Sequence, residues 1–161
     1  MINREYLLDA NIIIKIWSKC PKLLDEIENC SNLHFKISQD IAIELSQKEF
    51  ASFNGTPVLS EKFLKIIDHV IQEPPFDENL ISNNKSVKIV YNDKSKVYNV
   101  DQFKVSKSDF NLICICNKYK TYSLVTEDKK LVSCARKIID SSRVLSFEDF
   151  INEVKSYCNL N

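Results

Sequence analysis

Glycine is nearly absent from this sequence, which has 161 residues and a single glycine, Gly55. Loops that hold nucleotide phosphates with backbone amides need several closely spaced glycines, so the Walker and dinucleotide-binding types of loop are excluded. An excess of charge is also absent, because Lys plus Arg and Asp plus Glu both number 22. The balance gives no support for a general polyanion binder or a polybasic membrane binder, and any contact with nucleic acid must be local.

Long apolar runs and paired cysteine motifs are missing as well. The longest apolar runs, such as residues 11–17, are too short to cross a bilayer, and residues 1–5 lack the charged-then-apolar order of an export signal. The six cysteines include no Cys-x-x-Cys pair, and Cys114 and Cys116 lie in an apolar helical pattern. We therefore expect a cytoplasmic protein with reduced thiols and no membrane contact.

The composition predicts one domain over residues 1–161. Hydrophobic residues make up 44% of the chain and charged residues 27%, which suffices for one core, and no low-complexity segment divides it. An insertion is expected around residues 74–105, with a polar loop at 74–85 and a β-hairpin formed by 87–91 and 97–100. The hairpin is either a plain embellishment or a flap that reaches toward substrate or partner.

Predicted strands and helices alternate along the chain. The strands are expected at residues 6–8, 33–37, 122–125 and 143–145. The helices are expected to begin near residue 11, after Pro21, after Ser38 (reaching Phe50), at 61–72, at 109–120, at 129–139 and after Ser146. This alternation predicts a three-layer α/β/α fold with a mainly parallel central sheet.

The stretch from residue 107 to 129 organises the predicted site. A helix of about eleven residues rises about 16 Å and a strand of about five returns about as far, so Asp109 and Asp128 are expected at the same edge of the fold. Two carboxylates at one edge, with Thr126 beside the second, suit a divalent metal ion. Each acid also fits a plain helix cap, since Ser106 and Asp109 have the capping-box spacing and Asp128 precedes a helix.

Two further acids are expected at this edge. Asp9 follows the first predicted strand and precedes a helix, the position where open α/β sheets bind ligands, and Asn11 adds an amide two residues later. A helix N-cap is an equally good interpretation of Asp9. Glu44 lies in the helix after Ser38, and helical side chains lean toward the N-terminus of their helix, so Glu44 should point back to the same edge.

The order of these motifs resembles that of the PIN-domain nucleases, a family that includes the toxins of VapBC-type toxin–antitoxin systems. The resemblance covers nearly the whole chain. It rests on a strand followed by Asp9-Ala10-Asn11, on a helical Glu44, on Ser108-Asp109-x-x-Leu112-Ile113, and on Leu124-Val125-Thr126-x-Asp128-x-x-Leu131.

The resemblance implies a PIN-like fold and a metal-dependent ribonuclease that cuts RNA. By this resemblance Asp9, Glu44, Asp109 and Asp128 are catalytic and bind Mg²⁺ or Mn²⁺, with Asn11 and Thr126 as polar supports. It also implies an antitoxin protein as a partner, and a homodimer is a further candidate assembly. A basic segment of such a partner, or the chain's own hairpin, would cover the acidic pocket, and we favour the external partner.

The chemistry of the acids agrees with this hypothesis. Hard oxygen ligands select Mg²⁺ or Mn²⁺, and such an ion lowers the pKa of a bound water. Four lysines flank the acids in sequence and are either phosphate contacts or plain solvated residues: Lys104, Lys107, Lys129 and Lys130. The alternatives are a metal-dependent phosphohydrolase, a receiver-like acidic pocket, and a catalytically silent binding module with the same fold.

Overall fold

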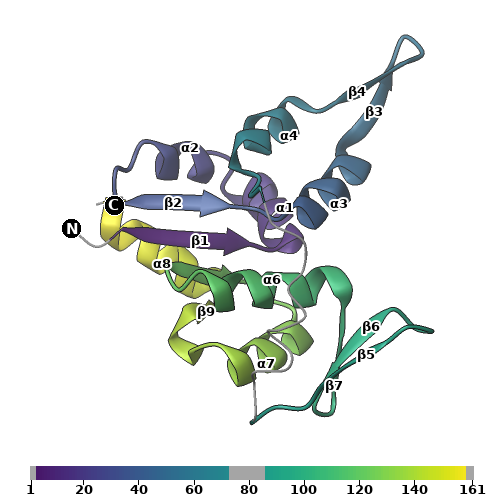
Figure 1. Cartoon of the computed structure of the whole chain (residues 1–161). Coiled ribbons are helices and arrows are strands. Elements are labelled where there is room, and N and C mark those ends of the chain that lie inside the picture. Colours follow the sequence, from purple (N-terminus) through teal and green to yellow (C-terminus); the bar gives the residue numbers. More distant parts are fainter. Residues whose placement is uncertain (1–2, 73–85, 159–161) are drawn as a thin grey trace.

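The protein is an α/β structure built on a four-stranded, all-parallel sheet with the strand order β2-β1-β8-β9 (Figure 1). The computed structural model describes residues 3–72 and 86–158, so the predicted loop at 74–85 lies outside the described residues. The strands are β1 (Arg4–Leu8), β2 (Leu33–Lys36), β8 (Tyr122–Val125) and β9 (Val144–Leu145). The predicted α/β class and the parallel central sheet are confirmed.

Helices lie on both faces of this sheet, which is consistent with the predicted three-layer arrangement. α2 packs against α8, whereas α6 packs against α7, and Figure 1 shows α6 in front of the sheet and α8 behind it. The α-helices are α1 (Ala10–Lys19), α2 (Leu23–Glu28), α3 (Gln39–Glu49), α4 (Glu61–Ile66), α6 (Lys107–Lys118), α7 (Lys129–Ile138) and α8 (Phe147–Cys158).

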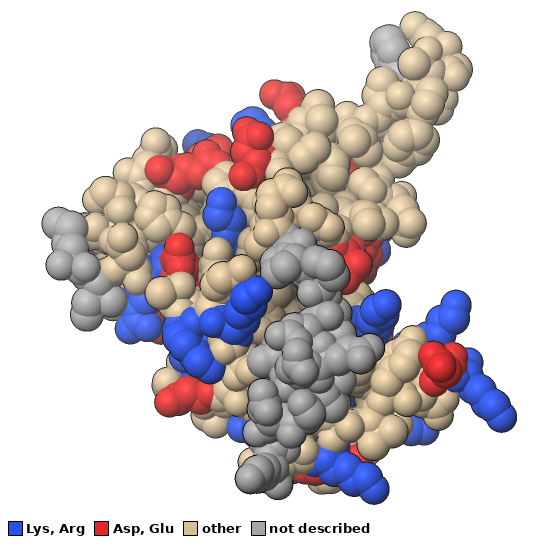
Figure 2. Space-filling view, viewed as in Figure 1, with Lys and Arg blue, Asp and Glu red and all other residues tan. Residues whose placement is uncertain are grey.

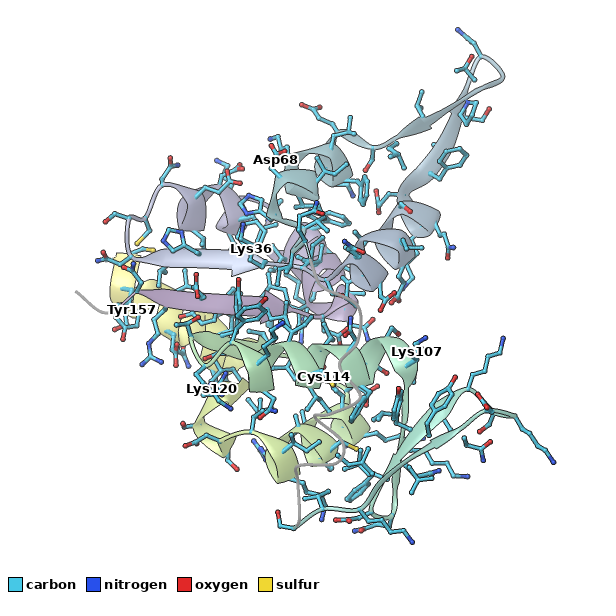
Figure 3. The ribbon with its side chains drawn as sticks, viewed as in Figure 1. Lys36, Asp68, Lys107, Cys114, Lys120 and Tyr157 are labelled. Atoms are coloured by element: carbon cyan, nitrogen blue, oxygen red, sulfur yellow. The ribbon has the colours of Figure 1, made fainter. Side chains whose placement is uncertain are left out.

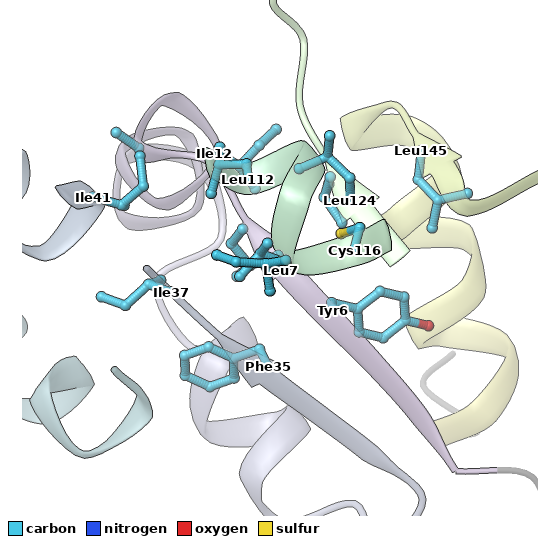
Figure 4. Packing of buried hydrophobic residues seen from close by; sticks show 14 of the residues in the cluster. Tyr6, Leu7, Ile12, Phe35, Ile37, Ile41, Leu112, Cys116, Leu124 and Leu145 are labelled. Carbon is cyan, nitrogen blue, oxygen red and sulfur yellow. The ribbon is translucent and has the colours of Figure 1, made fainter. Parts of the chain in front are cut away.

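The centre of the core is β1, whose Tyr6, Leu7 and Leu8 are completely buried. A strand covered on both faces needs apolar residues at successive positions rather than at alternate ones. The ring of Tyr6 meets Phe150 of α8 edge to face at a centroid distance of 4.9 Å, and its hydroxyl donates to Glu153 at 2.8 Å. Leu7 points to the opposite face, within the cluster drawn in Figure 4.

α6 leads away from the carboxyl edge of the sheet and β8 leads back to it. The turn between them is held by Arg143, the last residue of the 3₁₀ helix η2 (Ser141–Arg143). One guanidinium nitrogen, Nη2, donates to the carbonyl oxygens of Cys116 at 2.6 Å, Tyr119 at 3.1 Å and Tyr122 at 2.6 Å. Figure 3 labels Lys107, the first residue of α6, and Lys120, in the turn that follows the helix. Because the far turn is held, the helix and strand return the chain to the edge where α6 began.

The helix predicted to run from Ser38 to Phe50 is too long by one residue, and its end was wrong. Phe50 instead begins β3 (Phe50–Phe53), which pairs with β4 (Thr56–Leu59) in an antiparallel hairpin that projects from the molecule (Figure 1). Asn54 and Gly55 have φ values of 50° and 77°. An Asn-Gly pair with positive φ at both residues forms the tight turn that hairpins prefer, so this turn stops the helix pattern.

The helix predicted at residues 61–72 is also too long. α4 ends at Ile66, a 3₁₀ turn η1 (Ile67–His69) follows, and Val70 forms a parallel bridge with Ile37. The Ile37 N–H donates to the His69 carbonyl at 3.0 Å, and the Ile71 N–H donates to the Ile37 carbonyl at 2.9 Å. Pairing with the residue that follows β2 therefore ends the helix, although the apolar residues up to position 71 keep a helical spacing.

The predicted hairpin in the insertion is confirmed, with its second strand at β6 (Val97–Val100), but its first strand is β5 (Ile89–Asn92) rather than residues 87–91. A third strand that the sequence did not indicate, β7 (Phe103–Ser106), pairs with β6 and leads directly into α6. The ring of Tyr98 stacks on Phe110 of α6 at a centroid distance of 4.1 Å, and Lys137 of α7 pairs with Asp101 at 3.0 Å. The small sheet is thus attached to the helix that carries Asp109.

Two observations concern the membrane and redox expectations. Within residues 3–72 and 86–158, the helices are too short or too polar to span a membrane. All six cysteines are free, and Cys114, Cys116 and Cys134 are buried.

Candidate functional site

Asp9 lies at the carboxyl end of β1, where it caps α1. Its Oδ1 accepts the Ala10 N–H at 2.7 Å and its Oδ2 accepts the Thr126 hydroxyl at 2.7 Å. The side chain is buried, with Asp9 only 5% exposed. Burial raises the pKa of Asp9 to about 6, and the charges of Asp109 and Glu44 add to this rise against the lowering effect of the two hydrogen bonds. The N-cap interpretation is therefore confirmed, and the carboxylate also belongs to a group of acids.

Asp109 lies in the first turn of α6, whose N-cap is Ser106. The Asp109 N–H donates to the Ser106 hydroxyl oxygen at 3.1 Å, and the interaction of Ser106 with the Asp109 carboxyl lowers the pKa of that carboxyl. Burial raises the pKa of Asp109, and the nearby charges of Asp128 and Glu44 raise it further. The predicted return of the chain from Asp109 to the same edge at Asp128 is thus confirmed.

Asp128 and Thr126 follow β8 and connect it to α7. One oxygen of Asp128, Oδ1, accepts the N–H groups of Lys130 at 2.8 Å and Leu131 at 3.1 Å, which makes Asp128 the N-cap of α7. The Thr126 hydroxyl donates to Asp9 and accepts the Asp128 N–H at 3.1 Å. Thr126 is 1% exposed, and because it hydrogen-bonds to both Asp9 and Asp128, it fixes the position of one relative to the other.

Glu44 lies on α3 and is the most loosely held of the four acids. Its carboxylate pairs with Lys48 one turn later at 2.9 Å, and the Glu44 side chain is 43% exposed. Its charge nevertheless raises the pKa of both Asp9 and Asp109, so α3 brings it to the same edge. Figure 2 shows acidic side chains gathered between α3 and the start of α6, with basic side chains on the neighbouring three-stranded sheet.

The four acids lie close enough to repel one another, but they do not form a compact coordination sphere. Among the residues that the structure describes, no group of three or more His, Cys, Asp or Glu side chains is arranged to hold a metal ion. In the same residues, Lys48 is the only basic side chain that forms an ion pair with one of the four. The donor set consists only of carboxylate oxygens whose negative charge is poorly balanced, and this set fits a hard divalent cation.

The polar and basic residues that were predicted to assist the acids differ in burial and in contact with them. Thr126 contacts two of the acids, whereas Asn11 is exposed on the first turn of α1. The lysines proposed for phosphate contacts are all exposed: Lys104 on β7, Lys107 at the start of α6, and Lys129 and Lys130 at the start of α7. Lys107, Lys129 and Lys130 thus lie within two residues of Asp109 or Asp128.

Sequence reasoning missed a pocket beside the acids and the arginine that lines it. Arg136 lies on α7, seven residues after Lys129, and both line an open pocket with Thr126. The spacing of seven residues places two side chains on one helix face and was visible in the sequence. Nothing in the sequence, however, showed that this face borders Thr126.

Comparisons of the chain with models of protein families, with curated proteins and with solved structures found no match.

Proposed function

We propose that this protein is a metal-dependent ribonuclease with a PIN-like fold. One observation carries the proposal: the charges of Glu44, Asp109 and Asp128 act on one another or on Asp9 near the carboxyl edge of the parallel sheet, and the pKa values of Asp9 and Asp109 are raised. Acids that repel one another in a partly buried position are a costly arrangement unless a cation completes it. The carboxyl edge is also where open α/β sheets bind their ligands.

Each acid has a distinct task in this proposal. The buried Asp9 and the half-buried Asp109, whose pKa values are raised, would hold the cation, with Asp9 oriented by the Thr126 hydroxyl. Glu44 and Asp128 would complete the set, Glu44 by leaving its exposed pair with Lys48. When bound, Mg²⁺ or Mn²⁺ supplies an activated water and offsets charge on the phosphodiester and its leaving oxygen.

The chain's own residues would attract and position the RNA. Lys107 and Lys129 flank Asp109 and Asp128, and lysines at such positions bring phosphates toward acids that would otherwise repel them. RNA selected in this way is recognised through its backbone. We therefore propose RNA as the substrate class without a fixed base sequence.

The acid cluster also supports a proposal about regulation. A basic side chain from an antitoxin-like partner would neutralise the four carboxylates in the way that Lys48 already pairs with Glu44. The insertion sheet is an alternative cover, but its described contacts anchor it to α6 and α7 through Tyr98 and Asp101. An external basic segment is therefore the cover that we propose.

A titration of Mg²⁺ and Mn²⁺ into an RNA cleavage assay tests the function. We expect no cleavage in excess EDTA, and activity that rises with either ion and saturates. Asp25→Asn removes an exposed acid on α2 and serves as the matched control that keeps full activity. Cleavage that is equally fast in EDTA would refute the proposal.

A catalytically silent binding module is the second candidate, because the described acids are not gathered into a ready metal-binding group. One experiment, RNA binding and cleavage measured together, distinguishes the two proposals. A silent module would bind RNA without cutting it at any concentration of Mg²⁺ or Mn²⁺, whereas the ribonuclease would cut it.

A further inference from the structure

An open pocket of about 640 Å³ lies beside the acids, between α7 and the end of β9. Thr126 forms its wall toward the acids. The other residues that matter here are Lys129, Val132, Ser133 and Arg136 of α7, and Leu145 of β9. The pocket is therefore at the same carboxyl edge of the sheet, but it lies one strand further along.

One face of α7 gives the pocket its mixed character. Lys129, Val132, Ser133 and Arg136 follow the spacing i, i+3, i+4 and i+7, which places all four on one side of the helix. Two cations thus frame an apolar centre, which continues on the opposite wall at Leu145. Val132 is half-buried, and both cations are exposed.

The other polar groups of the pocket already have partners. The Ser133 hydroxyl donates to the Lys129 carbonyl at 2.9 Å, and the Ser146 hydroxyl donates to Asp149 at 2.7 Å. Glu127, the acid on the rim, pairs with Lys15 at 2.6 Å, which balances its charge. What remains for a ligand is positive charge from Lys129 and Arg136 together with apolar surface.

A neighbouring acid competes weakly for one of these cations. The charge of Arg136 lowers the pKa of Asp149, but the hydrogen bonds from Ser146 lower it more. Asp149 lies at the surface, where an ion pair is screened by water and stabilises little. Arg136 is therefore available to a ligand with a stronger and bidentate anion, such as a phosphate.

Thr126 links this pocket to the acids. Its hydroxyl donates to Asp9 at 2.7 Å, and its N–H donates to the Leu145 carbonyl at 3.1 Å. The same residue thus touches a buried acid on one side and a pocket-lining strand on the other. A polymeric ligand that reached both the acids and this pocket would place two successive monomers on the two sides of Thr126.

We propose that this pocket binds one nucleotide of single-stranded RNA next to the phosphodiester at the acids. Arg136 and Lys129 hold the phosphate of that nucleotide, and Val132 and Leu145 contact its base. The base must be unstacked to enter, which selects single-stranded over double-stranded RNA. This inference rests on the proposed ribonuclease function and names a substrate subsite for it.

The kinetic test uses Arg136→Gln and Ser133→Glu, which remove a cation from the pocket and add an anion to it. Lys120→Gln is the control, since it removes one positive charge from the exposed turn between α6 and β8. We expect each pocket variant to raise KM for single-stranded RNA about tenfold with kcat changed less than about twofold, the pattern for lost uniform binding. The control should leave both constants unchanged. Unchanged KM in both folded pocket variants would overturn the inference and leave the function standing.

A binding test does not depend on cleavage. Adenosine 5′-monophosphate added to the metal-free protein should shift the methyl NMR signals of Val132 and Leu145, and Arg136→Gln should weaken this binding about tenfold. Inorganic phosphate should bind much more weakly, because it lacks the base. If phosphate alone binds as tightly, or if no shift occurs at these methyl groups, the nucleotide pocket is wrong. Binding without any RNA cleavage would keep the pocket and refute the ribonuclease.

Discussion

Replacing Asp9 by Asn should stabilise the metal-free protein at neutral pH. The carboxylate is 5% exposed and interacts with the charges of Asp109 and Glu44. The substitution keeps the size of the side chain and leaves a good helix N-cap, while it removes the buried charge. Replacing a side chain that accepts two good hydrogen bonds ordinarily destabilises a protein. A gain in stability for Asp9→Asn would therefore show that the Asp9 charge is electrostatically unfavourable in the metal-free protein.

The magnitude follows from the pKa of Asp9. A rise from 3.8 to about 6 corresponds to about 3 kcal/mol of unfolding free energy. Because the folded pKa lies above the unfolded one, the wild type is relatively more stable below about pH 4, and it loses this stability as the pH rises to about 6. Asn does not titrate, so the variant does not lose this stability as the pH rises. Its single carbonyl oxygen cannot serve both Ala10 and Thr126, which costs about 1 kcal/mol, so a net gain of about 2 kcal/mol is expected.

Urea unfolding of both proteins from about pH 4 to about pH 8, in EDTA, measures this difference. The stability of Asp9→Asn relative to wild type should rise over the lower part of this range and then level off. Saturating Mg²⁺ should reverse the order, because it stabilises only the form that binds it. A difference that does not change with pH, or a variant that is less stable at neutral pH in EDTA, would show that the Asp9 charge does not destabilise the metal-free fold.

Three other variants test separate parts of the structure. Glu44→Gln should weaken Mg²⁺ binding about tenfold by calorimetry, whereas Glu49→Gln on the same helix should not; equal affinities would remove Glu44 from the site. Arg143→Lys should lower the unfolding free energy by about 2 kcal/mol in urea, because the shorter lysine side chain cannot bring its ammonium to the position of Nη2 and has no Nε–H to donate to the Tyr122 carbonyl; full stability would contradict the role given to this arginine. Deletion of residues 92–95 should change RNA cleavage by less than about twofold, and a large increase would show that the hairpin covers the acids.

Much of the site could be predicted because it depends on chain order and on the lengths of regular elements. Asp109 and Asp128 return to one edge because α6 and β8 span similar distances, and Asp9 ends the strand beside β8. The same short-range patterns also identified three of the acids as helix caps. The cap and the ligand interpretation are compatible, since a carboxylate oxygen can accept from a backbone N–H and still face a cation.

What could not be predicted depends on contacts between distant segments or on a turn signal that was overlooked. The bridge between Ile37 and Val70 shortens α4, and no local pattern indicates it. β7 requires a partner in β6, and the pocket at Arg136 requires β9 to lie beside α7. The β3–β4 hairpin is different, because Asn54-Gly55 is a strong local turn signal that the helical pattern around Leu45 obscured.

The most direct measurement is single-turnover cleavage of a labelled RNA by wild type and by Asp109→Asn in saturating Mg²⁺. Asp109 is a partly buried acid whose charge interacts with Asp128 and Glu44, and Asn keeps its shape and its place in the cap of α6. We expect the variant to remain folded by circular dichroism and to lose cleavage by at least about a hundredfold. Cleavage by folded Asp109→Asn at the wild-type rate would contradict the claim that these acids form the catalytic site.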